Sequence, residues 1–598
     1  MGNMFDRIAA LPAEKRALLM QQLQERRPTG EASSDSDQYD VAILGGGMAG
    51  LTVALQIKKS RPATRILVVE KQKHPVPEAA HKVGESTVEI ASHYLRDILE
   101  LDNHLQTQQL RKFGLRMFFS SNGNQDITQR VELGSTVFPP LCTYQLDRGR
   151  LENALGSELP RQGIVFLDDC KVQQIILQPQ SESHRLRILQ EGNEREIAAR
   201  WVVDASGRNT LLQRQLGLAK KVGHTANAVW FRVGHPININ DWSSDPAWQA
   251  RISQGERSLS TNHLMGPGYW VWLIRLASDS ISIGIVTDAS VHSFEGMNRF
   301  DRAMDWLHAH EPQCADVIEE HRDQVQDFRV MKNYSYSCQQ IFSGERWCLV
   351  GEAGVSLDPL YSPGSDLIAI GNGLTYDLIT RELNGEDIRG RAAIHDKLFL
   401  SLTQIWLGIY EQQYSLLSNA QIMVAKIIWD TAFYWGVFGL LYFHDTFRNI
   451  AESPGVAASL ARLALVSNRA QAFFREWHAI DQPAASNLFV DLYSPLDFMV
   501  KLHTGMAAGL AHAELEAQFA SNVRLFERLA GQMASTVIAV HANHPENEAI
   551  LSQIKRWQTE PLLAEMIALY RRESRTTPID SSWIAVGHRK REKQQVAR

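Results

Sequence analysis

The sequence has 598 residues, 44% of them hydrophobic and 21% charged, which is the composition of a globular protein with room for more than one core. A formal net charge of −6 excludes the strong basic excess of a nucleic-acid-binding protein, so we expect small-molecule or protein partners. Five cysteines without a CxxC pair indicate neither a disulfide framework nor a zinc site, and we expect a cytoplasmic protein without a metal.

The first 38 residues differ from the rest of the chain. LPAEKRALLMQQL has a helix-start proline and apolar residues at helical spacing, and the polar linker PTGEASSDSD comes next. The acidic residues and the lack of a continuous apolar core exclude a secretory signal. We predict a short tethered helix in residues 1–38, either a docking element or an extension without a role.

Short β-rich runs alternate with helical segments from residue 39 onward. DVAIL, RILVV, IVFLD and RWVVD are typical of buried parallel strands joined by crossover helices, so the predicted fold class is α/β. Alternating segments such as AVWFRV and SISIGIV indicate an antiparallel sheet inserted at about residues 225–340. We expect residues 39–389 to form one domain that contains this insertion.

A GxGxxG motif directly follows the first of these strands. Gly45, Gly47 and Gly50 permit a tight turn at the start of a helix, where backbone N–H groups meet a pyrophosphate. Glu70, which ends the next strand 20 residues after Gly50, can accept the ribose hydroxyls. The pattern predicts a Rossmann-type dinucleotide site, to which Met48, Ala49 and Lys71 also belong.

Two further segments resemble the flavoprotein hydroxylase superfamily and favour FAD over NAD. LDRGRLENAL places Arg148 at the cofactor-contacting position, and WCLVGEAGVSLDPLYSPGSD repeats the strand, acid and helix pattern late in the chain. The late acid is Glu352 where the superfamily usually has aspartate, which puts the geometry of that contact in doubt. No second GxGxxG unit for a nicotinamide is visible, so reduced FAD would come from a separate flavin reductase or from a transient NAD(P)H visit.

Three separated motifs resemble the flavin-dependent halogenases, most closely the branch that acts on phenols, pyrroles and carrier-bound substrates. The first is Gly84-Glu85-Ser86-Thr87, and the second is Lys112 at the expected distance behind it. The third is the tryptophan pair Trp270 and Trp272 with Ile274, where Arg275 replaces the family's proline. The resemblance covers roughly residues 39–385 and includes Ser86 among the cofactor-binding residues.

The resemblance implies a specific use of the flavin. Reduced flavin and O2 would give a flavin hydroperoxide, which oxidises chloride or bromide to hypohalous acid. Trp270 and Trp272 would separate flavin from substrate, so that the diffusible oxidant travels through a closed passage and direct hydroxylation cannot compete. Lys112 would hold hypohalous acid, or carry the halogen as a chloramine, beside one substrate carbon.

The loop YSPGSD is where the family binds halide. Pro363 has no N–H to donate, so Gly364, Ser365 and the Ser362 side chain are the halide candidates, and Gly364 also belongs to the cofactor set. Indole halogenases place a glutamate where this chain has Tyr361, which argues against free tryptophan as substrate. We expect an electron-rich phenol or pyrrole, free or tethered to a carrier protein, near Tyr361.

Residues 390–598 have helical periodicity almost throughout. The most apolar window, Ala432–Phe443, has 12 residues and is too short to span a bilayer, so we interpret it as a buried or cleft-lining helix and expect no transmembrane segment. The helical region either covers the substrate side of the flavin domain or adds core packing.

Two other functions remain open from the sequence. One is an FAD-dependent monooxygenase or desaturase on the same scaffold, which Arg275, Glu352 and Glu89, the last in place of a common proline, keep under consideration. The other is a flavin-binding assembly-line component whose main role is docking and whose catalysis is weak.

Overall fold

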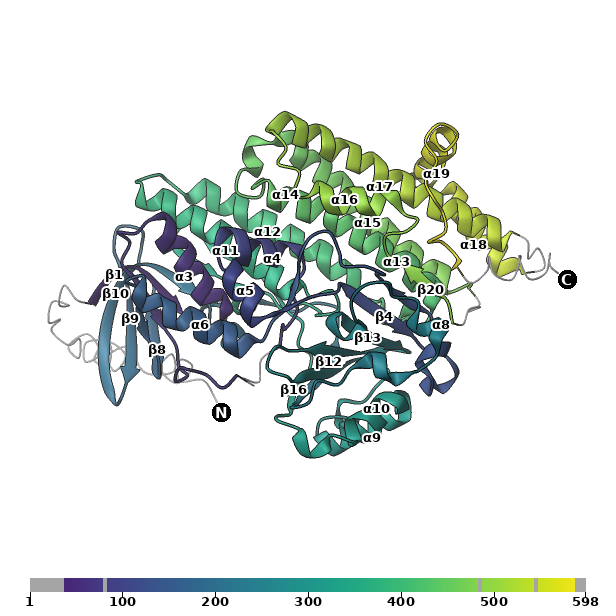
Figure 1. Ribbon diagram of the computed structural model, residues 1–598. Helices are drawn as coiled ribbons and strands as arrows, with labels where there is room; N and C mark the ends of the chain where they lie inside the picture. Colours follow the sequence, from purple (N-terminus) through teal and green to yellow (C-terminus); the bar gives the residue numbers. More distant parts are fainter. Residues whose placement is uncertain (1–36, 79–82, 482–486, 543–546, 587–598) are drawn as a thin grey trace, which may run out of the picture.

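The computed structural model describes residues 37–78, 83–481, 487–542 and 547–586. Figure 1 shows the parallel sheet at one end of the molecule, a second sheet with helices beneath it, and the C-terminal helices across the top. The short helix predicted in residues 1–38 falls almost wholly outside the described residues, and it stays a prediction.

The first sheet is the predicted parallel sheet, and it confirms the α/β fold class. All four strands expected from the sequence lie in it, with β1 between β10 and β2 in parallel register. Three helices connect or follow these strands along the chain: α3 (Met48–Ser60), α6 (Arg148–Arg161) and α11 (Pro363–Leu383). Its strand order is β18 (Phe342–Ser343), β19 (Trp347–Leu349), β10 (Asn193–Asp204), β1 (Gln38–Leu44), β2 (Ile66–Val69) and β7 (Val165–Leu167), with the hairpin β8 (Cys170–Ile176) and β9 (His184–Gln190) attached to β10.

The second sheet is larger than the predicted insertion at residues 225–340, and it is mixed. Its strand order is β16 (Arg329–Met331), β12 (Ala226–Val233), β15 (Ile281–Asp288), β14 (Tyr269–Arg275), β13 (Thr261–Gly266), β4 (Leu115–Phe119), β5 (Glu132–Gly134) and β20 (Phe489–Asp491). β4 pairs with β13 in parallel, and β20 joins β5 in the same way. Strands from three distant segments therefore build one wall, which local alternation of side chains cannot reveal.

Strand β14 contributes to two different cores because its side chains alternate between faces. Tyr269, Val271 and Leu273 pack toward α9 (Phe300–His310) and α10 (Pro312–Glu319), in a small cluster of their own. Trp270 and Trp272 belong to the main core, which runs from the parallel sheet into the C-terminal helices. The alternation thus aims both indoles at the main core.

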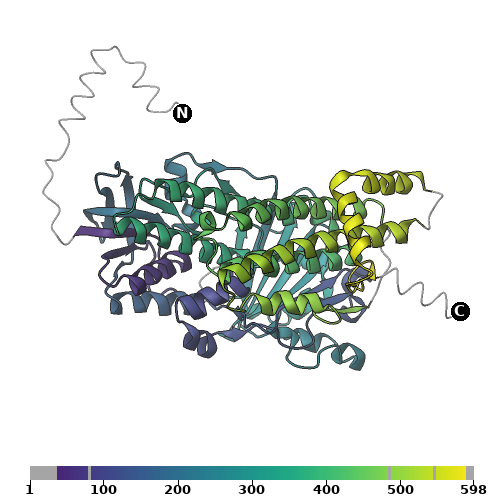
Figure 2. The ribbon, with the colours of Figure 1, turned by 90° about the horizontal axis from the view of Figure 1, so that it is seen from above.

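The C-terminal region is helical, as predicted. Seen from above in Figure 2, its long helices cross the molecule in front of the strands of the second sheet. Its helices are α12 (Arg389–Tyr410), α13 (Ala420–Phe433), α14 (Leu440–Phe443), α15 (Pro454–His478), α16 (Asp497–Gly505), α17 (His512–His541), α18 (Glu548–Thr559) and α19 (Pro561–Glu573), and a π-helical stretch, Tyr434–Gly439, joins α13 to α14.

The most apolar window is part of a longer helical segment than its own 12 residues indicate. Residues Ala420–Phe443 form 24 continuous helical residues, which is long enough to cross a membrane by length and composition alone. However, 89% of its most apolar 18-residue window is buried inside the protein. The segment is therefore a core element of the fold, in agreement with the predicted buried helix.

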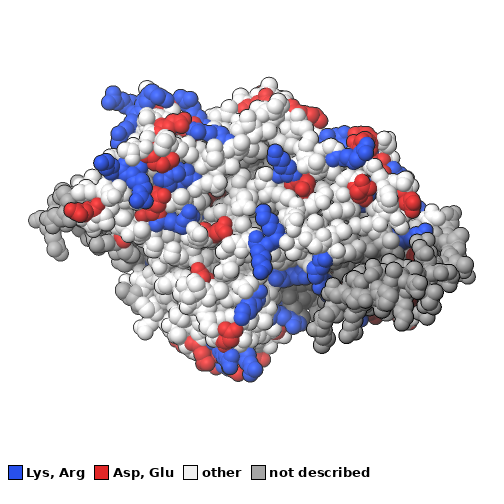
Figure 3. All heavy atoms as spheres, turned by 180° about the vertical axis from the view of Figure 1, so that it is seen from behind, with Lys and Arg blue, Asp and Glu red and all other residues white. Residues whose placement is uncertain are grey.

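Basic side chains gather on the outer end of the C-terminal helices, as the view from behind in Figure 3 shows. Lys555 and Arg556 on α18 and Arg571 and Arg572 on α19 are exposed. Glu573, at the end of α19, pairs with Arg524 and Arg528 of α17, so part of the positive charge in this region is compensated.

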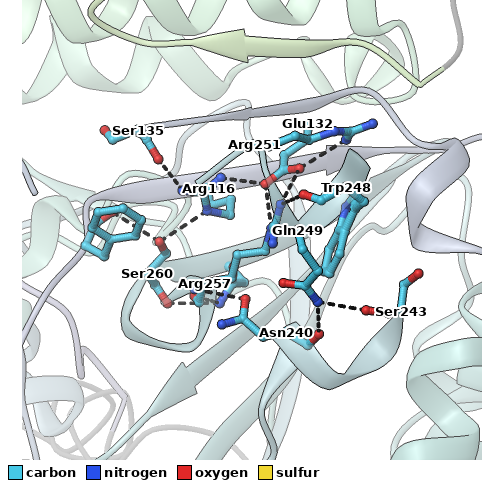
Figure 4. Close-up of polar contacts among 12 residues, drawn as sticks. Arg116, Glu132, Ser135, Asn240, Ser243, Trp248, Gln249, Arg251, Arg257 and Ser260 are labelled. Carbon is cyan, nitrogen blue, oxygen red and sulfur yellow. Dashed lines mark hydrogen bonds and ion pairs between the residues drawn. The ribbon is translucent and has the colours of Figure 1, made fainter. Parts of the chain in front are cut away.

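A buried cluster of charges fixes the part of the second sheet that carries β4 and β5 (Figure 4). Glu132 is fully buried, and its carboxylate accepts from Arg116 at 2.5 Å, Arg257 at 2.8 Å and Arg251 at 3.1 Å. Three guanidinium groups share one carboxylate, so the pKa of Glu132 stays low although burial raises it. Arg116 also donates to the Ser135 carbonyl, which ties the cluster to the start of the next loop.

We expect Glu132→Gln to lower the free energy of unfolding by about 3–5 kcal/mol, because the substitution leaves buried guanidinium groups without a counter-charge. Chemical denaturation with urea measures the change. Glu196→Gln is the matched control, since it breaks an exposed pair with Arg185 and is expected to cost less than about 1 kcal/mol. Equal losses in the two variants would contradict the central role of Glu132.

Candidate active site

A cavity of about 830 Å³ opens at the carboxyl ends of the parallel strands. This size lies within the range of small-molecule and cofactor sites. Its walls come from the turn before α3, the end of β2, the start of α6 and the loop that leads into α11. All but one of the cofactor-binding residues predicted from the sequence line this cavity: Gly45, Gly47, Met48, Ala49, Glu70, Lys71, Ser86, Arg148, Glu352 and Gly364. The exception is Gly50, which lies in the first turn of α3.

The glycine turn has the shape that a pyrophosphate needs. Gly45 has φ +126°, and a Cβ on Gly50 would lie 2.0 Å from the Gly45 carbonyl oxygen, so neither position accepts a side chain. A Cβ on Gly47 would meet nothing within 4 Å, which leaves the start of α3 open toward the cavity. The Gly46 N–H donates to Glu70 at 2.6 Å, which holds that carboxylate at the cavity wall.

The residues present fit FAD. Arg148 donates to the Val83 carbonyl and to Glu152, while its buried Nε has no partner among the described residues. Glu352 is half-exposed at the opposite wall, where Ser356 donates to it at 3.3 Å. These groups can bind the three parts of one extended ligand. The open helix start suits the phosphates, the fixed Glu70 suits the ribose, and the free Arg148 N–H suits the flavin.

The tryptophan pair lines the same cavity on its sheet side. The two rings lie 5.8 Å apart and are almost fully buried. The Trp272 ring rests on Gly284, where a Cβ would come within 2.1 Å of it, and its N–H donates to Ser282. Arg275 points away from the cavity, toward Ser258 at 3.5 Å and Glu256 at 3.7 Å, so it has a local structural partner.

A buried polar network that the sequence did not predict holds Trp270. Its indole N–H donates to the Tyr414 hydroxyl at 3.0 Å, and Tyr414 donates to Asp358 at 2.5 Å. Tyr334 and His224 converge on the same carboxylate oxygen, each at 2.7 Å. Because Tyr414 belongs to the C-terminal region, the helices beyond residue 390 help to position the indole.

Lys112 lies outside the large cavity, buried at its boundary. Its ammonium donates to the Ser86 hydroxyl at 2.7 Å and to the Thr87 carbonyl at 2.9 Å. Ser86 itself lines the large cavity, so the lysine is one hydrogen bond away from it. Burial lowers the pKa of Lys112 to about 8, against the opposing charges of Glu89 and Asp366.

Lys112 faces a second cavity of about 70 Å³. Tyr361, the predicted substrate residue, lines it, and its hydroxyl donates to Asp430 at 3.2 Å. The C-terminal region supplies about half of the remaining wall, including Trp406, Ile409, Ile427, Asp430, Tyr434, Trp435, Phe438 and Tyr493. Three carboxyl groups line this cavity, those of Glu89, Asp366 and Asp430, and none of them has a role predicted from the sequence.

The loop YSPGSD separates the two cavities. The predicted halide residues Ser362, Gly364 and Ser365 face the large cavity. Tyr361, Pro363 and Asp366 face the small one. Ser362 has φ +58°, which turns the chain into α11, and the buried Ser365 hydroxyl has no partner among the described residues.

The comparisons with known proteins agree with this geometry. The family model for lycopene cyclase protein matches residues 40–229, which contain the glycine turn and Lys112. Flavin-dependent halogenase chlA from Dictyostelium discoideum is 27% identical over 433 residues, 67% of this chain and 70% of that protein. The 1H-pyrrole-2-carbonyl-(peptidyl-carrier protein) chlorinase of Pseudomonas fluorescens is 25% identical over 348 residues, 55% of this chain and 73% of that protein.

The chain is similar to the flavin-dependent halogenases. These halogenases are oxidoreductases of the FAD-dependent superfamily. The fold of halogenase PltM, solved with phloroglucinol and FAD, matches with a TM-score of 0.57 at 17% identity, over 82% of this chain and 96% of that one. The halogenase CmlS matches with a TM-score of 0.50 at 20% identity, over 66% and 65%. The fold match to PltM extends well beyond residue 385, so the shared fold includes part of the helical C-terminal region.

We expect Gly47→Ala to weaken FAD binding by about 10-fold or more without destabilising the apoprotein, because the added methyl enters open space in front of the helix start. FAD titration by fluorescence measures affinity, and thermal unfolding of the apoprotein measures stability. An unchanged FAD affinity would show that the pyrophosphate does not bind at this turn.

Proposed function

We propose that the protein halogenates an electron-rich aromatic ring or pyrrole with FADH2, O2 and chloride or bromide. The observation that carries this proposal is the position of Lys112, buried in a second cavity and linked to the flavin cavity through Ser86. An oxidant formed at the flavin has a short protected route to this amine. A hydroxylase has no need of such a route, since its substrate must meet the flavin directly.

Bound reduced FAD supplies, with O2, the oxidising power that converts halide to hypohalous acid. Gly364 and Ser365 at the start of α11, with the Ser362 side chain, bind the halide through N–H and O–H donors. Trp270 and Trp272 form the sheet side of the flavin cavity and exclude water and substrate from it. The loop YSPGSD, which separates the two cavities, then keeps the organic substrate in the small cavity.

Lys112 guides the halogen because its nitrogen can act as a base and as a nucleophile near neutral pH. With a pKa of about 8, a useful fraction of the side chain is a neutral amine at pH 7–8. The neutral amine accepts a hydrogen bond from hypohalous acid or takes its halogen. Burial keeps competing water away from that halogen.

The lining of the small cavity suits an aromatic ring. Trp406, Tyr434, Trp435 and Phe438 offer ring faces and edges, and the carboxyl groups offer hydrogen-bond acceptors to O–H or N–H groups. A phenol or pyrrole needs no further activation, since its heteroatom donates electrons into the ring. One relative acts on a pyrrole carried by a peptidyl-carrier protein, and we propose either a free or a carrier-tethered ring here.

The C-terminal region closes the substrate side. We propose that residues 390–598 act as the cover of a domain formed by residues 39–389, because α12, α13 and the π-helical stretch all line the small cavity. A separate flavin reductase supplies FADH2. The docking role predicted for residues 1–38 applies if the substrate is tethered to a carrier protein.

We expect Lys112→Met to reduce halogenated product at least about 100-fold, because the halogen loses its fixed position next to the ring. The assay supplies FADH2, O2 and chloride or bromide to phenolic and pyrrolic substrates, with mass spectrometry of the product. Oxidation of reduced flavin should continue at the wild-type rate. Lys332→Met, a surface substitution, is the control. Undiminished halogenation in Lys112→Met would contradict the proposed route.

A further inference from the structure

The three carboxyl groups of the small cavity differ in how fully they are paired. Asp430 accepts from Lys426 at 2.7 Å, from Gln471 at 2.7 Å and from Tyr361 at 3.2 Å, so both its oxygens are used. Glu89 lies 3.1 Å from Nε2 of His503, and burial, which raises its pKa, is outweighed by this neighbour. Both groups therefore have structural partners that a ligand would have to displace.

Asp366 is different. It lies in the first turn of α11 and has no exposed surface. Its Oδ1 accepts from the Ala91 N–H at 2.9 Å and the Tyr434 hydroxyl lies near enough to the carboxyl group to lower its pKa, whereas no hydrogen bond of ordinary geometry reaches its buried Oδ2 among the described residues. An unpaired buried oxygen costs free energy, and because this one lines the small cavity it is available to a ligand group.

Lys112, in the same cavity, has an N–H donor without an acceptor among the described residues. An ammonium group has three N–H donors, and Ser86 and Thr87 take two of them. Lys112 and Asp366 lie close enough for each charge to influence the other's ionisation. A ring held between them would have the halogen donor on one side and a free carboxyl oxygen on the other.

We propose that Asp366 is a catalytic base of the halogenation step, which accepts the ring proton that the halogen replaces; this inference rests on the proposed function. The halogen passes from oxygen of hypohalous acid, or from Nζ of Lys112, to a ring carbon. The carbon–halogen bond forms, and the electron pair of the broken bond stays on oxygen or nitrogen. The electron pair of the carbon–hydrogen bond then returns to the ring, and the proton goes to Oδ2 of Asp366.

The proton then leaves Asp366 for the hydroxide or amine that the first step produced. The sum is ring C–H plus hypohalous acid giving ring C–halogen plus water, with no further oxidant. Burial raises the pKa of Asp366 to about 8, against the lowering effects of Tyr434, Ala91 and Lys112. Because the pKa of Lys112 is also about 8, a proton can pass between the two groups with little change in free energy.

Asp366→Asn tests the proposal, because it keeps the shape and the bond from Ala91 but removes the base. We expect the halogenation rate to fall about 10²–10⁴-fold, the range of general base catalysis, while reduced flavin is oxidised at the wild-type rate. A substrate deuterated at the reacting carbon should react as fast as the protonated one in the wild type, but more slowly in Asp366→Asn. Glu89→Gln, which alters a paired carboxyl of the same cavity, should show no isotope effect.

Asp366→Ala with added formate gives a second measurement, since the small acid fits the space left by the side chain. Formate should restore halogenation in Asp366→Ala and leave Asp366→Asn unaffected. A wild-type rate without an isotope effect in Asp366→Asn would overturn the inference and leave the proposed function intact. A wild-type protein that forms no halogenated product would overturn both.

Discussion

The hydrogen bond from Lys112 to Ser86 is the contact on which the rest of the site depends. Ser86 belongs to the wall of the flavin cavity, and Lys112 belongs to the small cavity behind it. The bond therefore lies where the two cavities meet, whereas elsewhere the loop YSPGSD separates them. Flavin chemistry and ring chemistry can then proceed at separate positions, which suits an oxidant that would damage an open site.

Burial gives these groups their chemical properties, and the C-terminal helices provide it. Without α12, α13 and the π-helical stretch, Lys112 and Asp366 would face water, and desolvation could not bring their pKa values together near 8. The same region holds Trp270 through Tyr414 and Asp358. The helical region thus acts on both cavities, which makes it part of the site as well as a cover.

The sequence was most informative where function depends on local backbone geometry or on strict spacing. The glycine turn and the strand that carries Trp270 and Trp272 could be predicted from short runs of residues, whereas Lys112 behind GEST was predicted only from the resemblance to the halogenases. Asp366 and Asp430 could not. Their role depends on which groups leave a carboxyl oxygen paired or free, and that follows only from packing between separate segments, 275 residues apart for Ala91 and Asp366 and 69 for Tyr361 and Asp430. An acid in the first turn of an apolar helix was the one available signal for Asp366. The mixed second sheet escaped prediction for a similar reason, since β4, β5 and β20 join it from outside residues 225–340.

The central claim is that the substrate reacts in the small cavity and never meets the flavin. Turnover under ¹⁸O2 with halide, followed by mass spectrometry, tests it most directly. We expect a product that carries halogen and no ¹⁸O, because the labelled oxygen leaves as water when hypohalous acid reacts. A product that gains ¹⁸O whether or not halide is present would show that the substrate meets the flavin directly, as in a monooxygenase.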